Sequence, residues 1–157
     1  MNIDIIAVGK IKEKFFRDAI DEYVKRLSAF AKVTITEIKD EKIPDNASEA
    51  VCEKIKETEG RKILSAIKDG TVCALCIEGK LFSSEDIADF ILKSANTSSR
   101  ITFIIGGSLG LSDEVKSRAD VKMSFGKVTL PHQLMRVVLC EQIYRAFKIN
   151  HNESYHK

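Results

Sequence analysis

Histidine and basic side chains gather in the last part of the chain, where they could bind an anion or move a proton. The histidines are His132, His151 and His156. His132 and Arg136 are four residues apart, which places both on one face of a helix near its start. Histidine titrates near neutral pH, and a helix N-terminus beside an arginine suits a phosphate. The pattern predicts acid–base or anion-binding chemistry around His132, with a capping or packed histidine as the alternative.

The charge is divided unevenly along the 157 residues. Residues 1–115 carry 17 lysines and arginines against 20 acidic residues, whereas residues 116–157 carry 8 against 3. The net charge therefore changes from −3 to +5 between the two segments. A basic end on a near-neutral body favours an anionic partner, with nucleic acid as the leading candidate. An ordinary solvated basic helix explains the charge equally well.

Apolar runs and amphipathic segments alternate along the chain. The runs that predict strands are Ile3–Val8, Val33–Ile38, Val72–Ile77, Ile101–Ile105 and Val121–Phe125. The helical patterns are Glu13–Phe30, Glu49–Lys68, a segment from Ser83 through Leu92, a short segment after Gly110, and Pro131–Ile149. This alternation predicts an α/β fold, a mainly parallel sheet with helices on both faces, in one domain over residues 1–157.

Finer signals concern turns, caps and edges. The polar side of Val33–Ile38 predicts a strand near an edge, and Glu78–Lys80 predicts a turn. Gly60 predicts a bend in its helix. Ser83 with Asp86 three residues later resembles a capping box, and Asn46 or Ser48 could cap the helix that follows them.

Glycines follow three of the predicted strands at their carboxyl ends. They are Gly79, the pair Gly106 and Gly107, and Gly126. Ligands of open α/β sheets bind beyond these ends, and glycine lets the backbone approach them. The loop Gly106–Gly110 lacks both the dinucleotide fingerprint and the P-loop order. A flat heterocycle such as adenine, read by backbone groups, fits this pattern, and ordinary tight turns are the alternative.

The helical segment Pro131–Ile149 is apolar on nearly every side. A helix that is hydrophobic all round must be buried, and we expect a partner subunit to cover it. A central helix inside the monomer is the alternative. Glu141 and Arg145 within it are four residues apart and predict an ion pair.

The cysteines predict no metal site and no redox site. Cys73 and Cys76 form a C-x-x-C pattern, but the predicted strand points them to opposite faces. We interpret them, with Cys52 and Cys140, as core-filling residues in a reducing compartment. No run approaches the roughly 18 apolar residues of a membrane span, and no signal peptide is evident. We therefore expect a cytoplasmic protein without a membrane partner.

Several stretches together resemble the bacterial large-subunit ribosomal RNA pseudouridine N3-methyltransferases of the SPOUT superfamily. The stretches are IIGGSLGLS, SFGKVTLPHQLMRVVLCEQIYRAFKI and the final YHK, with Ile6–Lys10, Glu22–Leu27, Gly79-Lys80 and Ser83–Glu85. The resemblance covers the whole chain at collinear spacing. It implies a homodimer whose C-terminal part, about residues 101–157, contains a trefoil knot and the cofactor region.

The resemblance also implies a cofactor, a substrate and site residues. The cofactor is S-adenosylmethionine, and its contacts fall on Leu75, Gly106, Phe125, Gly126, Lys127, Val128, Thr129 and Leu130. The substrate is a pseudouridine of the large-subunit rRNA that faces the decoding centre in assembled ribosomes, and not DNA. The catalytic candidates are His132, Arg136 and His156, and the substrate-binding candidates are Arg136, Arg145, Tyr155, His156 and Lys157.

The implied reaction is an in-line methyl transfer to a ring nitrogen that must also lose a proton. His132 or His156 is the candidate base, although water can take that role. Two other functions remain open at this stage. One is a flavodoxin- or Rossmann-type nucleotide-binding enzyme, and the other is a non-catalytic module that binds RNA or ribosomes.

Overall fold

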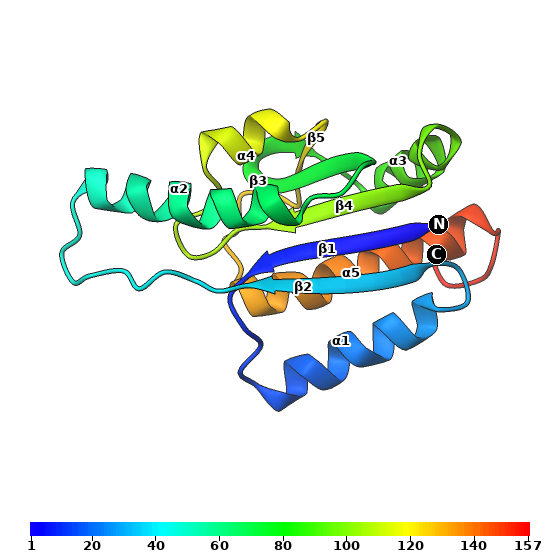
Figure 1. The fold of residues 1–157 in the computed structure, drawn as a ribbon. Helices are drawn as coiled ribbons and strands as arrows, with labels where there is room; N and C mark the ends of the chain where they lie inside the picture. Colours follow the sequence, from blue (N-terminus) through cyan, green and yellow to red (C-terminus); the bar gives the residue numbers. More distant parts are fainter.

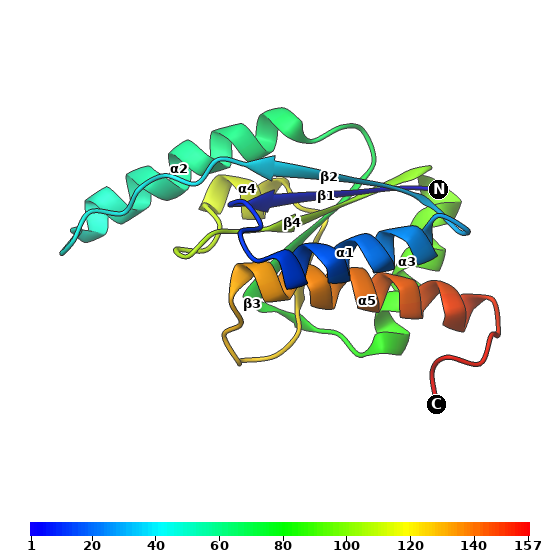
Figure 2. The same ribbon diagram turned by 90° about the horizontal axis from the view of Figure 1, so that it is seen from below.

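The computed structural model describes all 157 residues as a five-stranded sheet between two layers of helices (Figures 1 and 2). The strands are β1 (Asn2–Val8), β2 (Lys32–Ile38), β3 (Thr71–Leu81), β4 (Arg100–Ile105) and β5 (Val121–Ser124). The helices are α1 (Lys14–Leu27), α2 (Glu49–Ala66), α3 (Ser84–Thr97), α4 (Asp113–Arg118) and α5 (His132–Asn150). The sheet order is β2-β1-β4-β3-β5, and every pairing is parallel. The predicted α/β class is confirmed, and β2 lies at an edge as expected.

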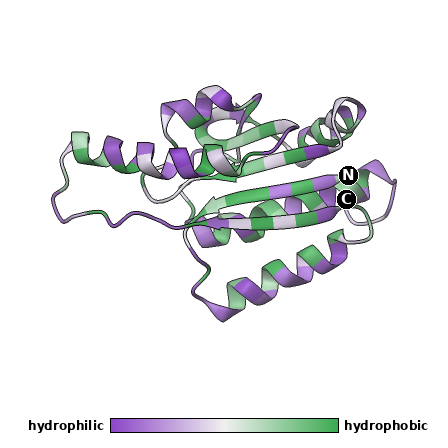
Figure 3. Cartoon of the chain, viewed as in Figure 1, coloured by the Kyte–Doolittle hydropathy of each residue, from purple (hydrophilic) through white to green (hydrophobic).

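Alternate side chains of the central strands pack into two separate cores. On one face, Ile5 of β1 and Phe103 of β4 pack against α1, α3 and α5. On the other face, Ile6 and Ile104 pack against α2 and α4. Successive side chains of a strand point to opposite faces, so a strand covered on both sides must be apolar throughout. Figure 3 shows this contrast, since the central strands are mostly hydrophobic whereas the helices mix both kinds of residue.

Strand β3 is longer than its apolar run predicts. The segment Glu78–Lys80 is not a turn, because β3 shifts register and pairs again with β5 through Lys80 and Leu81. At Gly79 an added Cβ would lie 2.8 Å from the backbone carbonyl oxygen of Lys122. The glycine therefore allows β3 and β5 to approach closely rather than allowing the chain to reverse.

Helix α2 runs unbroken through Gly60, so the predicted bend is wrong. An added Cβ at Gly60 would lie 3.3 Å from Val115 Cγ2 and even closer to the Ser112 hydroxyl. Gly60 is needed for close packing of α2 on the start of α4. The predicted caps are present, since Ser83 and Asp86 form a capping box and the Ser48 hydroxyl accepts the Val51 N–H at 3.2 Å.

The cysteines agree with a structural role. Cys73 and Cys140 are buried in the core beneath α1, α3 and α5, whereas Cys52 and Cys76 are half-buried. Burial raises the pKa of Cys140 to about 12 and also raises the pKa of Cys73. Both buried thiols therefore stay protonated at neutral pH and are poor nucleophiles. Among the helices, none combines the length and the apolar character that crossing a membrane requires.

Candidate active site

The carboxyl ends of β3, β4 and β5 surround a cavity of about 790 Å³. Its wall contains seven of the eight predicted cofactor residues, namely Leu75, Gly106, Phe125, Gly126, Val128, Thr129 and Leu130. Lys127, the eighth, is exposed and is not part of the wall. His132 and Met135 from the first turn of α5 complete one side. The volume lies within the range of sites for nucleotide-sized ligands.

Two glycine segments give the cavity walls of bare backbone. An added Cβ at Gly106 would lie 2.9 Å from the carbonyl carbon of Gly110, and the Gly110 N–H donates to the Gly107 carbonyl at 3.0 Å. Gly126 has a φ of +119°, and its N–H donates to the Ser124 hydroxyl at 3.1 Å. The walls thus combine backbone polar groups with apolar side chains. These groups could hold a flat heterocycle such as adenine.

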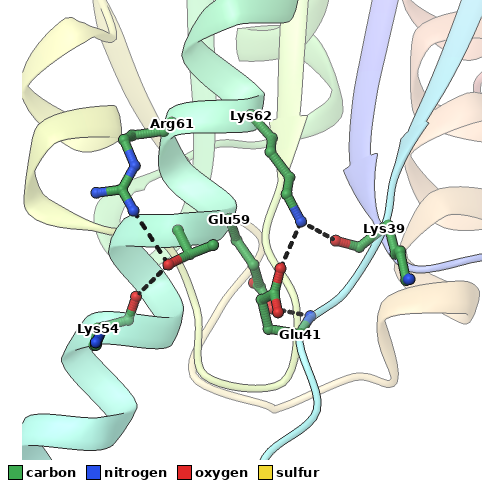
Figure 4. A network of polar contacts seen from close by, with 7 residues as sticks. Lys39, Glu41, Lys54, Glu59, Arg61 and Lys62 are labelled. Carbon is green, nitrogen blue, oxygen red and sulfur yellow. Dashed lines mark hydrogen bonds and ion pairs between the residues drawn. The ribbon is translucent and has the colours of Figure 1, made fainter.

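The back of the loop Gly106–Gly110 rests on a buried carboxylate of α2. Glu59 is 6% exposed, and its Oε2 lies 3.2 Å from the position of a Cβ at Gly107. Its Oε1 accepts the Glu41 N–H at 3.1 Å, while Lys62 pairs with the Glu41 carboxylate at 2.5 Å (Figure 4). Burial raises the pKa of the Glu59 carboxyl, against the opposing effect of its hydrogen bond from Glu41. Glu59 therefore joins α2, the segment after β2 and the cavity loop.

The sequence contained a signal for Glu59 that pattern reading missed. Ile55, Glu59 and Ile63 are spaced four apart and form one buried stripe of α2. An acidic residue in the apolar stripe of a helix indicates a buried partner.

Replacing Glu59 with glutamine is expected to raise the free energy of unfolding at neutral pH. Glutamine still accepts the Glu41 N–H, and it removes a charge that burial disfavours. A carboxyl whose pKa is raised on folding stabilises the fold below its unfolded pKa and loses that contribution as the pH rises through its folded pKa. The difference in the free energy of unfolding between Glu59→Gln and wild type should therefore grow from pH 4 to pH 7, as measured by urea denaturation. The exposed Glu57→Gln is the control, and a Glu59→Gln protein less stable than wild type at pH 7 would show that the charge is required.

His132 lies between the cavity and the loop that follows β1. It lines the cavity, and its ring Nε2 is 3.0 Å from the position of a Cβ at Gly9, where φ is +92°. A side chain at position 9 would therefore displace the imidazole. Among the predicted catalytic candidates, only His132 lies on the cavity wall.

Arg136 is buried and bonded to β2 and to the loop after β1. Its side chain is 1% exposed and donates to Glu37 Oε2 at 2.8 Å and to the Gly9 carbonyl at 2.9 Å. Burial alone would raise the pKa of Glu37, but hydrogen bonds from Arg136 and the Ile11 N–H hold it below its ordinary value. Arg136 also borders a cavity of about 380 Å³, together with Arg17 and Glu37. Its bonds give it a role in positioning the loop after β1, and its predicted contact with the substrate stays a prediction.

The C-terminal tail is ordered by contacts with α5 and α3. Arg145 pairs with Glu141 at 2.5 Å, as predicted, and its guanidinium lies 4.8 Å from the centre of the Tyr155 ring. The Tyr155 hydroxyl donates to Glu141 at 3.2 Å, and His156 Nε2 lies 2.7 Å from Glu85 Oε1. The structure thus brings Arg145, Tyr155 and His156 together, while Lys157 is exposed beside them.

The contacts of this tail cluster define proton positions. A guanidinium can only donate, so His156 Nδ1, 3.3 Å from Arg145 Nη1, must accept, and Nε2–H then donates to Glu85. Burial and the Glu141 carboxylate raise the pKa of Tyr155 to about 12, so its hydroxyl stays protonated at neutral pH. In this arrangement Tyr155 is a hydrogen-bond donor, and both ring nitrogens of His156 are engaged.

The tail cluster does not reach the cavity within one chain. Arg145 lies thirteen positions after His132 on α5, which corresponds to about 20 Å along the helix axis. The predicted site residues therefore fall into two groups, one at each half of α5.

Comparison with known proteins gives matches over the whole chain. The family model described as "Predicted SPOUT methyltransferase" matches residues 1–156. A protein of Lactobacillus acidophilus named "Ribosomal RNA large subunit methyltransferase H" is 60% identical, with all of both chains covered. Proteins of the same name from Lactococcus lactis subsp. cremoris and Bacillus cereus are 55% and 56% identical, also with all of both chains covered.

A solved structure shares the fold. The structure of a probable methylase family protein from Haemophilus influenzae Rd KW20 superimposes with a TM-score of 0.54 at 11% identity. The match covers 99% of this chain and 70% of that one. At this identity the likeness concerns the arrangement of strands and helices alone.

Proposed function

Because this chain belongs to the SPOUT methyltransferase family, we propose that it methylates N3 of a pseudouridine in large-subunit ribosomal RNA, with S-adenosylmethionine as methyl donor. The substrate is suggested by relatives at 55–60% identity whose names specify the large ribosomal subunit. Residues 1–157 form one catalytic domain in this proposal. The assembled ribosome is the substrate particle, which places the reaction in the cytoplasm.

The observation that carries the proposal is the cavity at the ends of β3, β4 and β5. Its glycine segments and apolar side chains fit an adenosine, and His132 stands on the same wall. S-adenosylmethionine supplies a methyl group already activated as a sulfonium. The remaining task of the protein is to orient the reacting atoms, which can contribute up to about 7–11 kcal/mol. His132, the histidine of the cavity, is suited to accept the proton that N3 loses.

The two groups of site residues suggest a homodimer. The cluster of Arg145, Tyr155 and His156 lies about 20 Å along α5 from His132, so one small substrate cannot touch both within one chain. A second copy that packs along α5 would bring its own tail towards the cavity. Apolar surface near the cavity supports such a contact, since Ile77, Leu81 and Val128 are 55%, 65% and 75% exposed. On α5, Leu134 and Val138 are only half-buried and belong to neither core.

Sedimentation at micromolar concentration should show a particle of about 35 kDa, twice the 17.6 kDa of the chain. Replacing Leu134 and Val138 with lysine should shift the particle towards one chain and reduce methyl transfer together. A 17.6 kDa wild-type species with full activity would exclude the dimer and the shared site.

The trefoil knot of the family is also part of the proposal. It is supported by the match of the SPOUT family model to residues 1–156. The loop Gly106–Leu111 and the segment Phe125–Pro131, which would belong to the knot, both line the cavity.

The test of function is transfer of a labelled methyl group from S-adenosylmethionine to ribosomes from cells that lack the enzyme. Label is expected in the large-subunit RNA and not in the small-subunit RNA. Calorimetric titration with S-adenosylmethionine should show binding. Binding of NAD or FMN instead would favour a flavodoxin- or Rossmann-type enzyme, and ribosome binding without label transfer would favour a non-catalytic module.

A further inference from the structure

The loop between β1 and α1 presents a basic surface beside the cavity. Residues 10–17 contain four basic residues and one acidic residue, a net charge of +3. Lys10 and Lys12 are exposed and take part in no ion pair, whereas Lys14 pairs with Asp18. Two free ammonium groups thus project from one short loop at the carboxyl end of the sheet. Such groups are suited to phosphate contacts.

Three hydrogen bonds hold this loop in place. The Ile11 N–H donates to Glu37 at 2.8 Å, and the Lys12 N–H donates to the Gln133 side chain at 3.0 Å. The buried Arg136 donates to the Gly9 carbonyl at 2.9 Å. The lysines therefore stand on a backbone that β2 and α5 already hold in place. This loop should lose less conformational entropy on binding than a flexible loop would.

An exposed aromatic ring adjoins the two lysines. Phe15, in the first turn of α1, is 64% exposed, and its ring centre lies 4.4 Å from that of the half-buried Phe16. An exposed phenylalanine beside unpaired lysines is a platform on which an unpaired base can stack. The platform adjoins the cavity, since Gly9 contacts His132 and α1 begins beside the start of α5 (Figures 1 and 2).

We propose that Lys10, Lys12 and Phe15 form a docking surface for an unpaired segment of the RNA next to the target nucleotide. The lysines bind its phosphates, and the Phe15 ring stacks on a base. Charge selects RNA rather than a neutral partner, and the hydrogen bonds from this loop to Gln133 and Arg136 of α5 keep the RNA in register with the cavity. The proposal rests on the proposed function and assigns the part of the substrate that lies outside the cavity.

The test compares Lys10→Ala/Lys12→Ala with Lys32→Ala/Lys68→Ala, in which two exposed lysines at the opposite end of the sheet are removed. The first double variant should raise KM for ribosomes about tenfold or more, with kcat within about twofold, and should reduce the salt dependence of binding by roughly two phosphate contacts. Phe15→Ala should also raise KM, without changing the salt dependence. The control should match wild type, and calorimetric binding of S-adenosylmethionine should be equal in all four proteins.

Filter binding of the same proteins to ribosomes separates this proposal from the proposed function. If wild type binds ribosomes without methylating them, the function fails, yet a loss of binding in Lys10→Ala/Lys12→Ala still supports the docking surface. If that variant and wild type bind ribosomes equally well and with equal salt dependence, the proposed docking surface is wrong, whether or not the proteins methylate RNA. Wild type that binds no ribosomes would overturn it as well.

Discussion

Replacing Arg136 with methionine is expected to lower the free energy of unfolding by about 3 kcal/mol, the lower end for a broken buried ion pair. The change leaves the Gly9 carbonyl without its donor and removes the partner of Glu37. The lower end applies because the Glu37 side chain is 38% exposed and water can solvate its charge. Urea denaturation at pH 7 measures the loss. Methionine retains the bulk of the side chain, so the loss reports the hydrogen bonds rather than a cavity.

The matched variant is Glu37→Gln, which keeps an acceptor for Arg136 and for the Ile11 N–H. Glu37→Gln should lower the free energy of unfolding by about 1 kcal/mol, the cost of a weakened hydrogen bond. The pKa of Glu37 is lowered on folding, so its contribution is present above the unfolded pKa and disappears as the pH falls through the folded pKa. The difference between Glu37→Gln and wild type should therefore shrink below about pH 4, near the ordinary carboxyl range. If Arg136→Met kept full stability and lost only methyl transfer, Arg136 would contact the substrate after all.

Removing Tyr155–Lys157 is expected to reduce kcat/KM on ribosomes by about 100-fold or more, the cost of losing groups that position the target nucleotide. Tyr155 and His156 pack against Arg145, and in the proposed dimer this cluster would face the cavity of the second copy. Binding of S-adenosylmethionine should not change, because no tail residue lines the cavity.

Two point variants refine the tail experiment. Tyr155→Phe loses only the hydroxyl that donates to Glu141 and should retain more activity than the truncation. Glu85→Gln keeps an acceptor for His156 Nε2 and serves as a control for the position of the tail. Unchanged methylation of ribosomes by the truncated protein would remove the tail from the site.

Local sequence pattern predicted the parts of the fold that depend on local forces. The uninterrupted apolar runs of β1 and β4 follow from coverage on both faces, and the cap at Ser83 follows from its own neighbours. The extension of β3 was missed because it depends on pairing with β5, about 40 residues later in the chain. Single-sequence periodicity carries no information on such a partner.

The parts of the site formed by residues close together in the sequence could be predicted, whereas the parts that depend on distant residues could not. Glycines at strand ends located the cavity, whereas the individual cofactor residues came from the family resemblance. The buried bonds of Arg136 were not predicted, because its acceptors, Glu37 and Gly9, lie 99 and 127 residues away in sequence. The order of the tail likewise depends on the distant Glu85. No pattern around these residues encodes such contacts, since only the tertiary fold brings the partners together.

The most direct test of the account is nucleoside analysis of large-subunit RNA after reaction with labelled S-adenosylmethionine. Ribosomes from cells lacking the enzyme are incubated with the purified chain, and the RNA is digested and separated. The account predicts that the label elutes as N3-methylpseudouridine, that His132→Ala lowers its yield, and that the Lys32→Ala/Lys68→Ala protein matches wild type. Label on any other nucleoside, or none while S-adenosylmethionine still binds, would contradict it.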